Sequence, residues 1–515
     1  MLTTLDYVVI VLYLAGVAAF GIKAGGRQKS TADYFLGNRD MPWWAVCFSV
    51  VATETSTLTV IGIPAVAYGG SLTFLQLTFG YLLGRIVVSM FFLPRYFQGE
   101  LVTAYALLGD RYGDAMRSTA SVTFLVTRLL ADGVRLFATA IPLKVIADSA
   151  GLDISYAFII SVIALFTIVY TLIGGIKAVV WMDVVQMAVY LGGAVVAVFV
   201  LLGQVPGDWW AQAAEAGKTQ VLYLATNESL STWITSPYAF VTAVVGGAVF
   251  SMASHGTDQL IVQRLLTCRD EQDSKKALIG SAVVAIFQFA LFLGVGLLLW
   301  SYYGGVSIAD LGLARGDEIF PKFIIEGLPP GVSGLLLAGI VAAAMSTLSS
   351  SLNSLASSSV FDLFERIPWF ARIRGKGLPA ARSLLVSRLF TVFWGIVFIF
   401  FATLFEDRDN PVVELGLAIA SFTYGGLLGV FLLGLFNKAT NQTDAVFSFV
   451  TTVIVMIWVI FSVWHHPQEG WIIRFMPGDE VVAREGLRAI AWPWYTAIGA
   501  GLHLVLGSLF ALRHR

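Results

Sequence analysis

Apolar stretches long enough to cross a lipid bilayer recur along this 515-residue chain, and they constrain its fold more than any other feature. The hydrocarbon core is roughly 30 Å thick, so a spanning helix needs about 20 mostly apolar residues. About thirteen stretches meet this requirement, at roughly 6–24, 43–68, 72–95, 119–147, 154–174, 176–203, 238–265, 276–302, 331–359, 382–405, 411–436, 443–465 and 490–511. The sequence therefore predicts an all-α polytopic membrane protein.

The composition agrees with this fold class and excludes several others. The chain is 57% hydrophobic and 13% charged, which excludes an ordinary soluble domain. Its net charge of −1 gives no basic or acidic bias, so we expect no nucleic-acid partner. The lipid bilayer is the expected partner, together with a small solute. The sequence does not define an oligomeric state, and a monomer is compatible with it.

Positively charged residues follow alternate spans, and this pattern predicts the orientation of the chain. They come after the first, third, seventh and ninth spans: Lys23, Arg27, Lys29, Arg95, Arg111, Arg117, Lys275, Lys276, Arg366, Arg372, Arg374, Lys376 and Arg382. The positive-inside rule then predicts an outside N-terminus and a cytoplasmic C-terminus in the inner or plasma membrane. No positive residue precedes "YVVIVLYLAGVAAFGI", so we interpret it as a retained helix and not as a signal peptide.

Two blocks of five spans, at 43–203 and 238–436, predict an inverted repeat, because an odd number of spans reverses the second block. The remaining segments are an extra first helix with a cytoplasmic loop (1–42), an extracellular loop (204–237) and two accessory helices (437–515). We expect 204–237 and 466–489 to be loops with short helices. In such folds the first helix of each block is broken near the membrane midplane. "FSVVATETSTLTVIGIP", which contains Glu54, and "SMASHGTDQLIVQR" supply the polar interruptions.

The segment "AAAMSTLSSSLNSLASSS", residues 342–359, places hydroxyl groups in the ninth span. Ser346, Ser349, Ser350 and Asn353 lie on one helix face and predict a polar surface. The alternative is close helix packing, with the hydroxyls bonded to their own carbonyls. Asp183 lies inside another span, where a carboxylate is costly unless it has a function. Hydroxyls, broken-helix carbonyls and a carboxylate are hard oxygen donors that suit Na⁺, whereas a proton carrier needs only the carboxylate.

Several stretches resemble the sodium/solute symporter family, which includes sodium/glucose, sodium/proline and sodium/sialic acid cotransporters. They are "TADYFLGNRDMPWWAVCFSVVATETSTLTVIGIPAVAY" (31–68), "YTLIGGIKAVVWMDVVQ" (170–186), "DQLIVQR" (258–264), "GLLLAGIVAAAMSTLSSSLNSLAS" (334–357) and "YGGLLGVFLLGLF" (424–436). The resemblance implies a LeuT-type 5+5 inverted repeat that works by alternating access. It also implies one or two bound Na⁺ ions.

The resemblance further implies the ion ligands. Sodium site two would take the carbonyls of Ala52, Thr55 and Ala343 and the hydroxyls of Ser346 and Thr347, where Thr347 replaces the usual serine. A second sodium site would use Asp183, Ser346, Ser349 and Ser350.

A solute site beside the sodium is implied in the same way. It would be lined by Ser56, Thr59, Phe74, Thr78, Asp258 and Gln259, and Phe422 or Tyr424 would close it from outside. Aromatic residues at helical spacing also serve simple packing, and that alternative stays open for the two gate residues.

Charged residues in "TRLLADGVRLF" bear on the charge of the solute. Arg128, Asp132 and Arg135 share one helix face and could form a charge ladder, which leaves one arginine over. Arg135 matches, within one residue, an arginine that sialic acid transporters of the family use to hold a carboxylate. A carboxylate-bearing solute such as sialic acid is therefore favoured over a neutral one. Glu54 either pairs with a donor from another helix, or binds a proton or a substrate amine.

These observations together predict a sodium-coupled symporter that imports a small polar organic solute. The alternatives are a sodium-coupled sugar or amino-acid symporter, or a proton-coupled transporter that uses Glu54 or Asp183. A channel or sensor with this fold is a second class, and a sensor would be expected to carry a further signalling domain. An enzyme is not expected, because the sequence has no nucleophile elbow and no H-E-x-x-H pattern.

Overall fold

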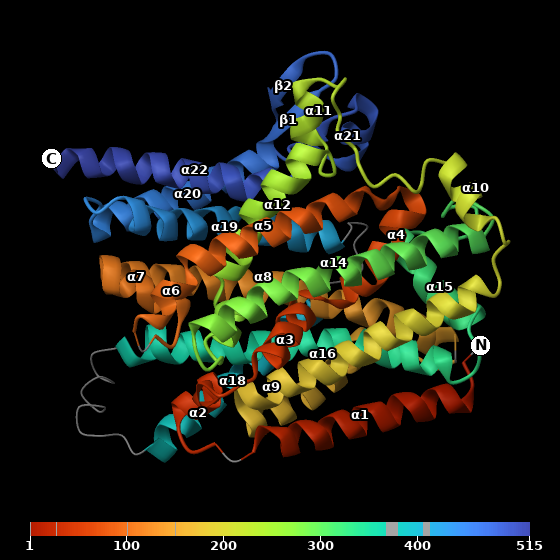
Figure 1. The fold of residues 1–515 in the computed structure, drawn as a ribbon, viewed down its shortest axis with the longest axis horizontal. Helices are drawn as coiled ribbons and strands as arrows, with labels where there is room; N and C mark the ends of the chain where they lie inside the picture. The colour runs from red at the N-terminus through yellow and green to blue at the C-terminus, as the bar shows by residue number, and fades with distance from the viewer. Residues whose placement is uncertain are drawn as a thin grey trace. The chain divides into compact units, whose positions relative to one another are not determined.

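The computed structural model describes residues 2–26, 28–99, 101–149, 151–366, 380–404 and 412–514. Four of the positive residues used for the orientation, Arg27, Arg372, Arg374 and Lys376, lie outside these ranges. The chain is predominantly helical and forms two compact units (Figure 1). Unit 1 comprises Met1–Leu75, Arg128–Val221 and Gln263–Leu415, and unit 2 comprises Gln76–Thr127, Leu222–Val262 and Gly416–Arg515.

Unit 1 is built around α16, Val332–Ser358, whose residues are almost all buried. Helices α1, α3, α4, α9 and α18 pack against it. The helices of this unit are α1 (Thr4–Gly25), α2 (Thr31–Leu36), α3 (Trp43–Glu54), α4 (Thr57–Gly69), the second part of α8 (Asp114–Ser149), α9 (Tyr156–Leu202), α10 (Trp209–Glu215), α14 (Glu271–Tyr302), α15 (Ile319–Glu326), α16 and α18 (Ala380–Thr403). A helix that is buried all round requires small residues, and the Ala, Gly and Ser residues of α16 supply them.

Unit 2 contains a second set of helices and a small sheet. Its helices are α5 (Leu75–Phe91), α6 (Leu93–Phe97), α7 (Ala104–Tyr112), the first part of α8, α11 (Leu230–Thr235), α12 (Gly247–Gly256), most of α19 (Val412–Phe436), α20 (Gln442–Ser462), α21 (Asp479–Glu485) and α22 (Trp492–Ala511). Helix α13 (Gln259–Leu265) crosses the boundary between the units. Helix α22 packs against both α12 and α20.

The segment 466–489 corrects one sequence prediction, which gave it loops and short helices only. It contributes to an antiparallel sheet of order β2-β1-β3, formed by Val463–His466, Gly470–Ile473 and Arg488–Ala489. The first two strands contain the aromatic and β-branched residues Val463, Trp464, Trp471, Ile472 and Ile473, which favour strands. Gly470 has a φ of 79° at the turn between β1 and β2, a conformation that suits glycine.

Both predicted helix interruptions are present. α3 and α4 meet at an angle of 68°, with Thr55 and Ser56 in extended backbone conformations. Ser56 begins α4 in a capping box with Thr59, so the new helix start is satisfied locally. In the seventh predicted span α12 ends at Gly256 and α13 begins at Gln259, where an Asp258 carboxylate oxygen accepts the N–H of Leu260 at 2.9 Å.

A further break separates the spans predicted at 154–174 and 176–203. They form one continuous helical element, α9, except at Gly175, whose φ of 57° and ψ of −156° are not helical. The turn is packed tightly against the end of α1, because a Cβ on Gly25 would lie 2.2 Å from the Gly174 Cα. The Gln28 side chain donates hydrogen bonds to the carbonyls of Gly25 at 2.7 Å and Gly174 at 2.9 Å. These contacts fix the turn against α1.

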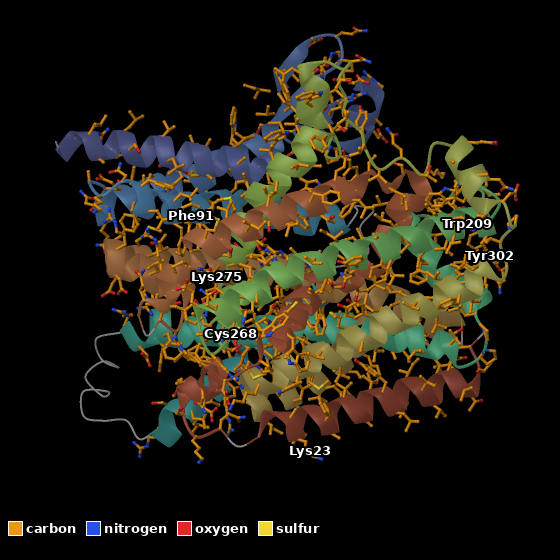
Figure 2. All side chains as sticks on the ribbon, in the orientation of Figure 1. Lys23, Phe91, Trp209, Cys268, Lys275 and Tyr302 are labelled. Atoms are coloured by element: carbon orange, nitrogen blue, oxygen red, sulfur yellow. The ribbon has the colours of Figure 1, made fainter. Side chains whose placement is uncertain are left out.

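Among the described residues, eight helices are long and apolar enough to span a membrane, or nine if α3 and α4 count as one span. Helix α8 carries several charges and α12 and α13 are short, so the predicted count of thirteen stays a prediction. Figure 2 places Lys23 and Lys275 toward one end of unit 1, and Trp209 and Tyr302 toward the other. The orientation of the chain across the membrane, which rests on the positive-inside pattern, stays a prediction.

Candidate ion and solute site

The break between α3 and α4 faces the middle of α16. The Thr57 hydroxyl donates to the carbonyl of Ile340 at 3.2 Å, and the Thr53 and Ser350 hydroxyls are 3.1 Å apart. The five residues predicted for sodium site two lie along this interface: Ala52 and Thr55 at the break, and Ala343, Ser346 and Thr347 on α16. All five are buried. The structure thus brings the two predicted ligand segments together.

Carbonyl and hydroxyl oxygen atoms are concentrated along this interface. Since α3 ends at Glu54, the carbonyls of its last turn have no later turn of the same helix to bond. The N–H and hydroxyl of Thr55 both bond the Val51 carbonyl, at 3.0 and 2.7 Å. The Thr347 hydroxyl donates to the Ala343 carbonyl at 3.2 Å, so two predicted ligands already bond each other. Hard oxygen donors of this kind fit Na⁺.

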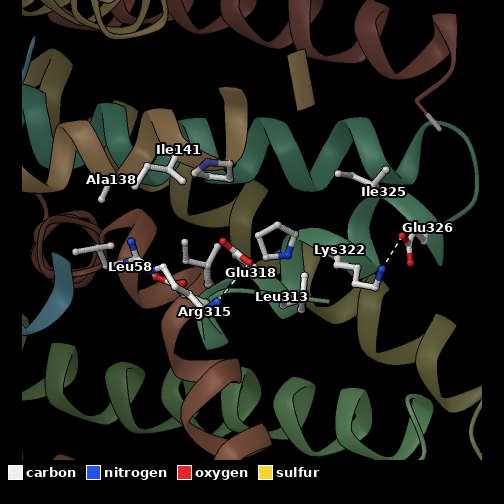
Figure 3. A pocket seen from close by; sticks show the side chains of 13 residues that line it. Leu58, Ala138, Ile141, Leu313, Arg315, Glu318, Lys322, Ile325 and Glu326 are labelled. Carbon is white, nitrogen blue, oxygen red and sulfur yellow. Dashed lines mark hydrogen bonds and ion pairs between the residues drawn. The ribbon is translucent and has the colours of Figure 1, made fainter. Parts of the chain in front are cut away.

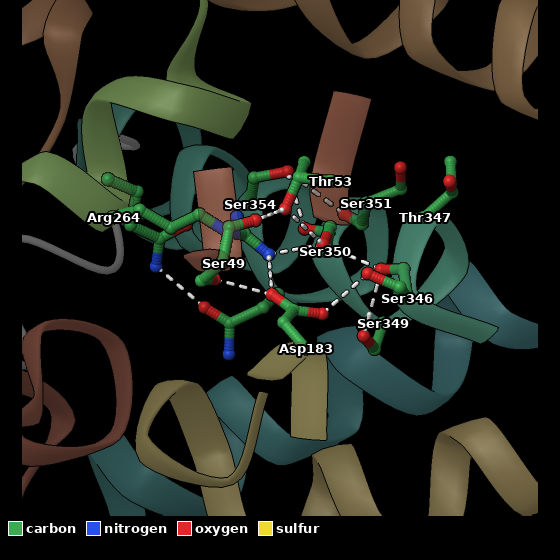
Figure 4. A network of polar contacts seen from close by, with 12 residues as sticks. Ser49, Thr53, Asp183, Arg264, Ser346, Thr347, Ser349, Ser350, Ser351 and Ser354 are labelled. Carbon is green, nitrogen blue, oxygen red and sulfur yellow. Dashed lines mark hydrogen bonds and ion pairs between the residues drawn. The ribbon is translucent and has the colours of Figure 1, made fainter. Parts of the chain in front are cut away.

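Asp183 is the centre of a polar cluster next to this interface (Figure 4). Its side chain is completely buried and accepts hydrogen bonds from Ser49 Oγ at 2.5 Å and Ser346 Oγ at 2.6 Å. The hydroxyls of Ser349 and Ser350 donate to the Ser346 carbonyl, at 3.0 and 2.6 Å. The four residues predicted for the second sodium site therefore form one connected group.

Arg264 belongs to the same cluster, although sequence reasoning gave it no role. Its Nη2 lies 3.5 Å from Asp183 Oδ2 and also donates to Ser350, and its Nε donates to Ser49 Oγ at 3.0 Å. Both charged side chains are fully buried. The direct contact is too long for a strong hydrogen bond, so Ser49 bridges the two charges. The signal was present in "LIVQRLL": an arginine among apolar residues requires a carboxylate partner.

A small cavity of about 10 Å³ lies at the start of α4. Its walls come from α4, α8 and α16, and they comprise Ser56, Thr57, Asp132, Arg135, Leu136, Thr139, Ala344, Thr347 and Leu348. Two predicted solute residues and one predicted sodium ligand thus line the same space. The Thr139 hydroxyl donates to that of Thr57 at 2.9 Å, which joins α8 to α4 at this point.

The charge ladder on α8 has the predicted form. Asp132 Oδ1 lies 3.2 Å from Arg135 Nη1 and 3.5 Å from Arg128 Nη1, and Asp132 Oδ2 accepts from Ser351 Oγ at 2.5 Å. Two guanidinium groups thus share the Asp132 carboxylate. The Arg135 side chain is 21% exposed, against 5% for Arg128, so Arg135 is the arginine that faces the open space.

A larger cavity of about 350 Å³ is lined by the following turns of the same two helices (Figure 3). Leu58 and Ile61 of α4 and Ala138 and Ile141 of α8 form part of its apolar wall. α15 and the segment before it supply two ion pairs, Arg315–Asp317 at 3.0 Å and Lys322–Glu326 at 2.8 Å. The two cavities follow one another along α4 and α8.

Two other predicted solute residues of unit 1 make contacts of a structural kind. Thr59 Oγ1 accepts the N–H of Ser56 at 3.3 Å as part of the α4 cap. The Phe74 ring packs on Phe289 with 5.1 Å between ring centroids. Glu54 is the last residue of α3, and the adjacent Thr55 hydroxyl accepts from Gln288 at 2.7 Å. The predicted roles of Thr59, Phe74 and Glu54 stay predictions.

The remaining predicted solute and gate residues lie in unit 2. The Tyr424 hydroxyl donates to Asp258 Oδ2 at 2.7 Å, so these two residues are in direct contact. Gln259 Oε1 accepts the N–H of Ala104 at 2.7 Å. Thr78 is buried on α5, and Phe422 packs against a buried cluster of α20 and α22. Their proposed solute and gate functions stay predictions.

A helix broken beside a buried oxygen-lined interface, within a mostly helical polytopic protein, is typical of secondary transporters. Comparison with known proteins gives the particular family. The chain belongs to the sodium:solute symporter family, whose family model matches residues 34–452. It is therefore a sodium-coupled symporter of the plasma membrane and not an enzyme.

Known relatives cover most of the chain. The sodium/sialic acid symporter NanT of Aliivibrio fischeri is 29% identical over 462 residues, or 88% of each chain. The human sodium/iodide cotransporter is 30% identical over 92% of this chain and 72% of its own. The mouse sodium-coupled monocarboxylate transporter 1 is 28% identical over 88% of this chain and 72% of its own.

Solved structures give the same result. The substrate-bound, outward-open structure of a Na⁺-coupled sialic acid symporter has a TM-score of 0.80 and 26% identity, and the match covers 99% of this chain and 98% of that one. Mhp1, a nucleobase-cation-symport-1 family transporter, has a TM-score of 0.54 at 13% identity and shares the fold. The predictions of family, fold, coupling ion and membrane location are confirmed.

Proposed function

We propose that this symporter imports an organic anion whose carboxylate binds Arg135. The observation that carries the proposal is the position of Arg135 in the small cavity with Ser56 and Thr347. Arg135 lines this space while it shares the Asp132 carboxylate with Arg128. The carboxylate of an anionic solute would pair with the Arg135 guanidinium.

The chemistry of the cavity fits a carboxylate with further polar groups. A guanidinium binds a carboxylate through two parallel hydrogen bonds, which makes arginine the preferred residue for this task. The hydroxyls of Ser56, Thr57 and Thr139 line the same walls and can bond hydroxyl or amide groups of a solute. The names of three relatives also support an anion, since they specify sialic acid, iodide and monocarboxylate.

Sodium binding at site two would link the ion to the solute. An ion held by Ala52, Thr55, Ala343, Ser346 and Thr347 would join the α3–α4 break to α16. Thr347 also lines the small cavity, so the ion and solute sites share a residue. Binding of either partner would then stabilise the closed arrangement of the break against α16. Reciprocal coupling of this kind is what symport requires.

The sodium stoichiometry has an electrical consequence. One Na⁺ with one monoanion moves no net charge, whereas a second Na⁺ at Asp183, Ser346, Ser349 and Ser350 would make transport carry one positive charge inward. At −100 mV that charge adds about 2.3 kcal/mol of driving force. Uptake by proteoliposomes with and without an imposed potential would measure the stoichiometry directly.

The experiment that tests the proposal compares an acid with its own neutral ester. Thermal unfolding of the purified protein is followed with sialic acid and sialic acid methyl ester, and with pyruvate and methyl pyruvate, each in Na⁺ and in choline. A ligand that binds the native state raises the unfolding midpoint. We expect at least one acid to stabilise the protein in Na⁺ and its ester to lose most of the effect.

Variants then assign the effect to Arg135. Arg135→Gln should weaken binding of the acid by about 2 kcal/mol, or roughly thirtyfold, because a charged hydrogen bond of this size is lost. Arg315→Gln is the matched control, since this arginine is paired with Asp317 in the larger cavity. Equal stabilisation by acid and ester, or normal acid binding by Arg135→Gln, would exclude a carboxylate at Arg135 and favour a neutral solute.

A further inference from the structure

A groove between α9 and α18 has features of a binding site that the transport cycle does not use. Its volume is about 320 Å³, and it is lined by Leu172, Ile173, Leu385, Arg388, Leu389 and Val392. The walls are aliphatic, and the exposed fractions of Leu385 and Leu389 are 56% and 58%. In a membrane such exposed side chains face lipid, so this groove opens to acyl chains and not to water.

Arg388 is the one charged residue of this groove, and its charge has no counter-ion in the described part of the chain. Its only hydrogen bond there is from Nη2 to Gln28 Oε1 at 3.4 Å, which is long. Its Nε atom is buried without a hydrogen-bond partner. On the neighbouring helix α2, Asp33 already pairs with Lys177 at 3.3 Å. A guanidinium at the edge of a bilayer with these contacts is under-satisfied and favours an external anion.

The depth of Arg388 matches that of a lipid headgroup. Gln28, its partner, also bonds the carbonyls of Gly25 and Gly174, next to the turn at Gly175. A turn between two spans lies at the membrane surface, so the guanidinium lies near the phosphate level. From there α18 continues into the membrane through Leu389 and Val392, which line the groove below the charge. The positive-inside pattern assigns this surface to the cytoplasmic leaflet.

We propose that this groove binds one anionic phospholipid, with its phosphate on Arg388 and an acyl chain along Leu172, Leu389 and Val392. Both parts of the site are necessary for this selectivity. The aliphatic walls bind an acyl chain, which a free phosphate ion lacks. The charge of Arg388 favours an anionic headgroup over a neutral one. A lipid bound here would hold α18 against α9 at the turn that Gln28 fixes to α1. Bound lipid should therefore stabilise unit 1.

The test uses the full-length protein in dodecyl maltoside, with thermal unfolding and native mass spectrometry as readouts. Phosphatidylglycerol, phosphatidylcholine and inorganic phosphate are added separately. We expect phosphatidylglycerol to raise the unfolding midpoint of the wild type, and to appear as one retained lipid. Arg388→Gln should need about tenfold more of this lipid, as expected for the loss of 1.4 kcal/mol.

Two further variants control this result. Arg382→Gln removes an exposed arginine from another face of α18 and should respond to phosphatidylglycerol like the wild type. Leu389→Trp fills the groove while Arg388 is kept, and its side chain faces lipid, so folding should be unaffected. It should lose the lipid effect even if Arg388→Gln cannot be purified. An unchanged response in Leu389→Trp, an equal effect of phosphatidylcholine, or an equal effect of inorganic phosphate would each overturn the proposal.

Discussion

The strongest prediction concerns the buried pair of Arg264 and Asp183. Replacing Arg264 with methionine keeps the length and apolar volume of the side chain but removes its charge. The Asp183 carboxylate is fully buried, and its remaining donors among the described residues are the hydroxyls of Ser49 and Ser346. Breaking a buried ion pair from one side costs about 3–5 kcal/mol. Because the two serines remain, we expect a loss of about 3 kcal/mol in the free energy of unfolding.

The reverse substitution and the double variant complete a thermodynamic cycle. Asp183→Asn removes the carboxylate that pairs with the buried Arg264 and should also cost about 3 kcal/mol. The double variant Arg264→Met/Asp183→Asn buries no charge, so its cost should be well below the sum of the two single costs. A coupling energy of about 2–3 kcal/mol is expected, since both residues share Ser49.

The assay is unfolding in mixed micelles, followed by circular dichroism, in choline buffer that contains no Na⁺. If the cost of the double variant equals the sum of the two single costs within about 0.5 kcal/mol, the pairing is refuted.

The response to Na⁺ provides an internal check. Arg264→Met retains the oxygen atoms of Asp183, Ser346 and Ser350 but has lost the resident cation, so added Na⁺ should stabilise this variant more than the wild type.

Two other predictions can be tested on the same preparations. Asp183→Ala should reduce the steepness of the sodium dependence of uptake. Ser346→Ala should abolish the coupling of uptake to sodium, because Ser346 is predicted for both ion sites. Unchanged sodium dependence in both variants would exclude the predicted ion ligands. Partial burial lowers the pKa of Lys218, which donates to the carbonyls of Tyr68 and Gly70 at 2.7 and 3.2 Å. The folded protein therefore binds this proton less tightly than the unfolded chain. The free energy of unfolding of the wild type, relative to that of Lys218→Met, should rise as the pH increases from the lowered pKa toward the ordinary lysine value. A difference that stays constant or falls over this pH range would contradict the prediction.

The membrane helices could be predicted closely from the sequence because each of them depends on local apolar length. The sequence predicts the ninth span at 331–359, and α16 runs from Val332 to Ser358. It predicts the tenth at 382–405, and α18 runs from Ala380 to Thr403. The helix breaks were also predictable, since polar residues and Gly256 interrupt apolar runs there. The small sheet at 463–489 was missed because its strands have at most four residues and no extended alternation.

The site was predicted less completely because its contacts join distant parts of the chain. Arg264 and Asp183 are separated by 81 residues, and neither local spacing nor periodicity relates them. The intramembrane position of Asp183 marked it as functional, but its partner could be chosen only once the helices were packed. By contrast, the ladder of Arg128, Asp132 and Arg135 lies within two turns of one helix, so its geometry followed from helical periodicity alone.

The hydroxyl groups of α16 have a consequence for the return of the empty carrier. Thr347 donates to the carbonyl of Ala343, Ser350 to that of Ser346, and Ser354 to that of Ser350. At the predicted ion sites, a hydroxyl without an ion can therefore bond its own helix, so that hydroxyl is not left unsatisfied in the membrane. If these sites bind Na⁺, loss of the ion costs these hydroxyls no hydrogen bond. After sodium is released into the cell, the empty carrier can then return to its outward-facing conformation with no ion bound at the site.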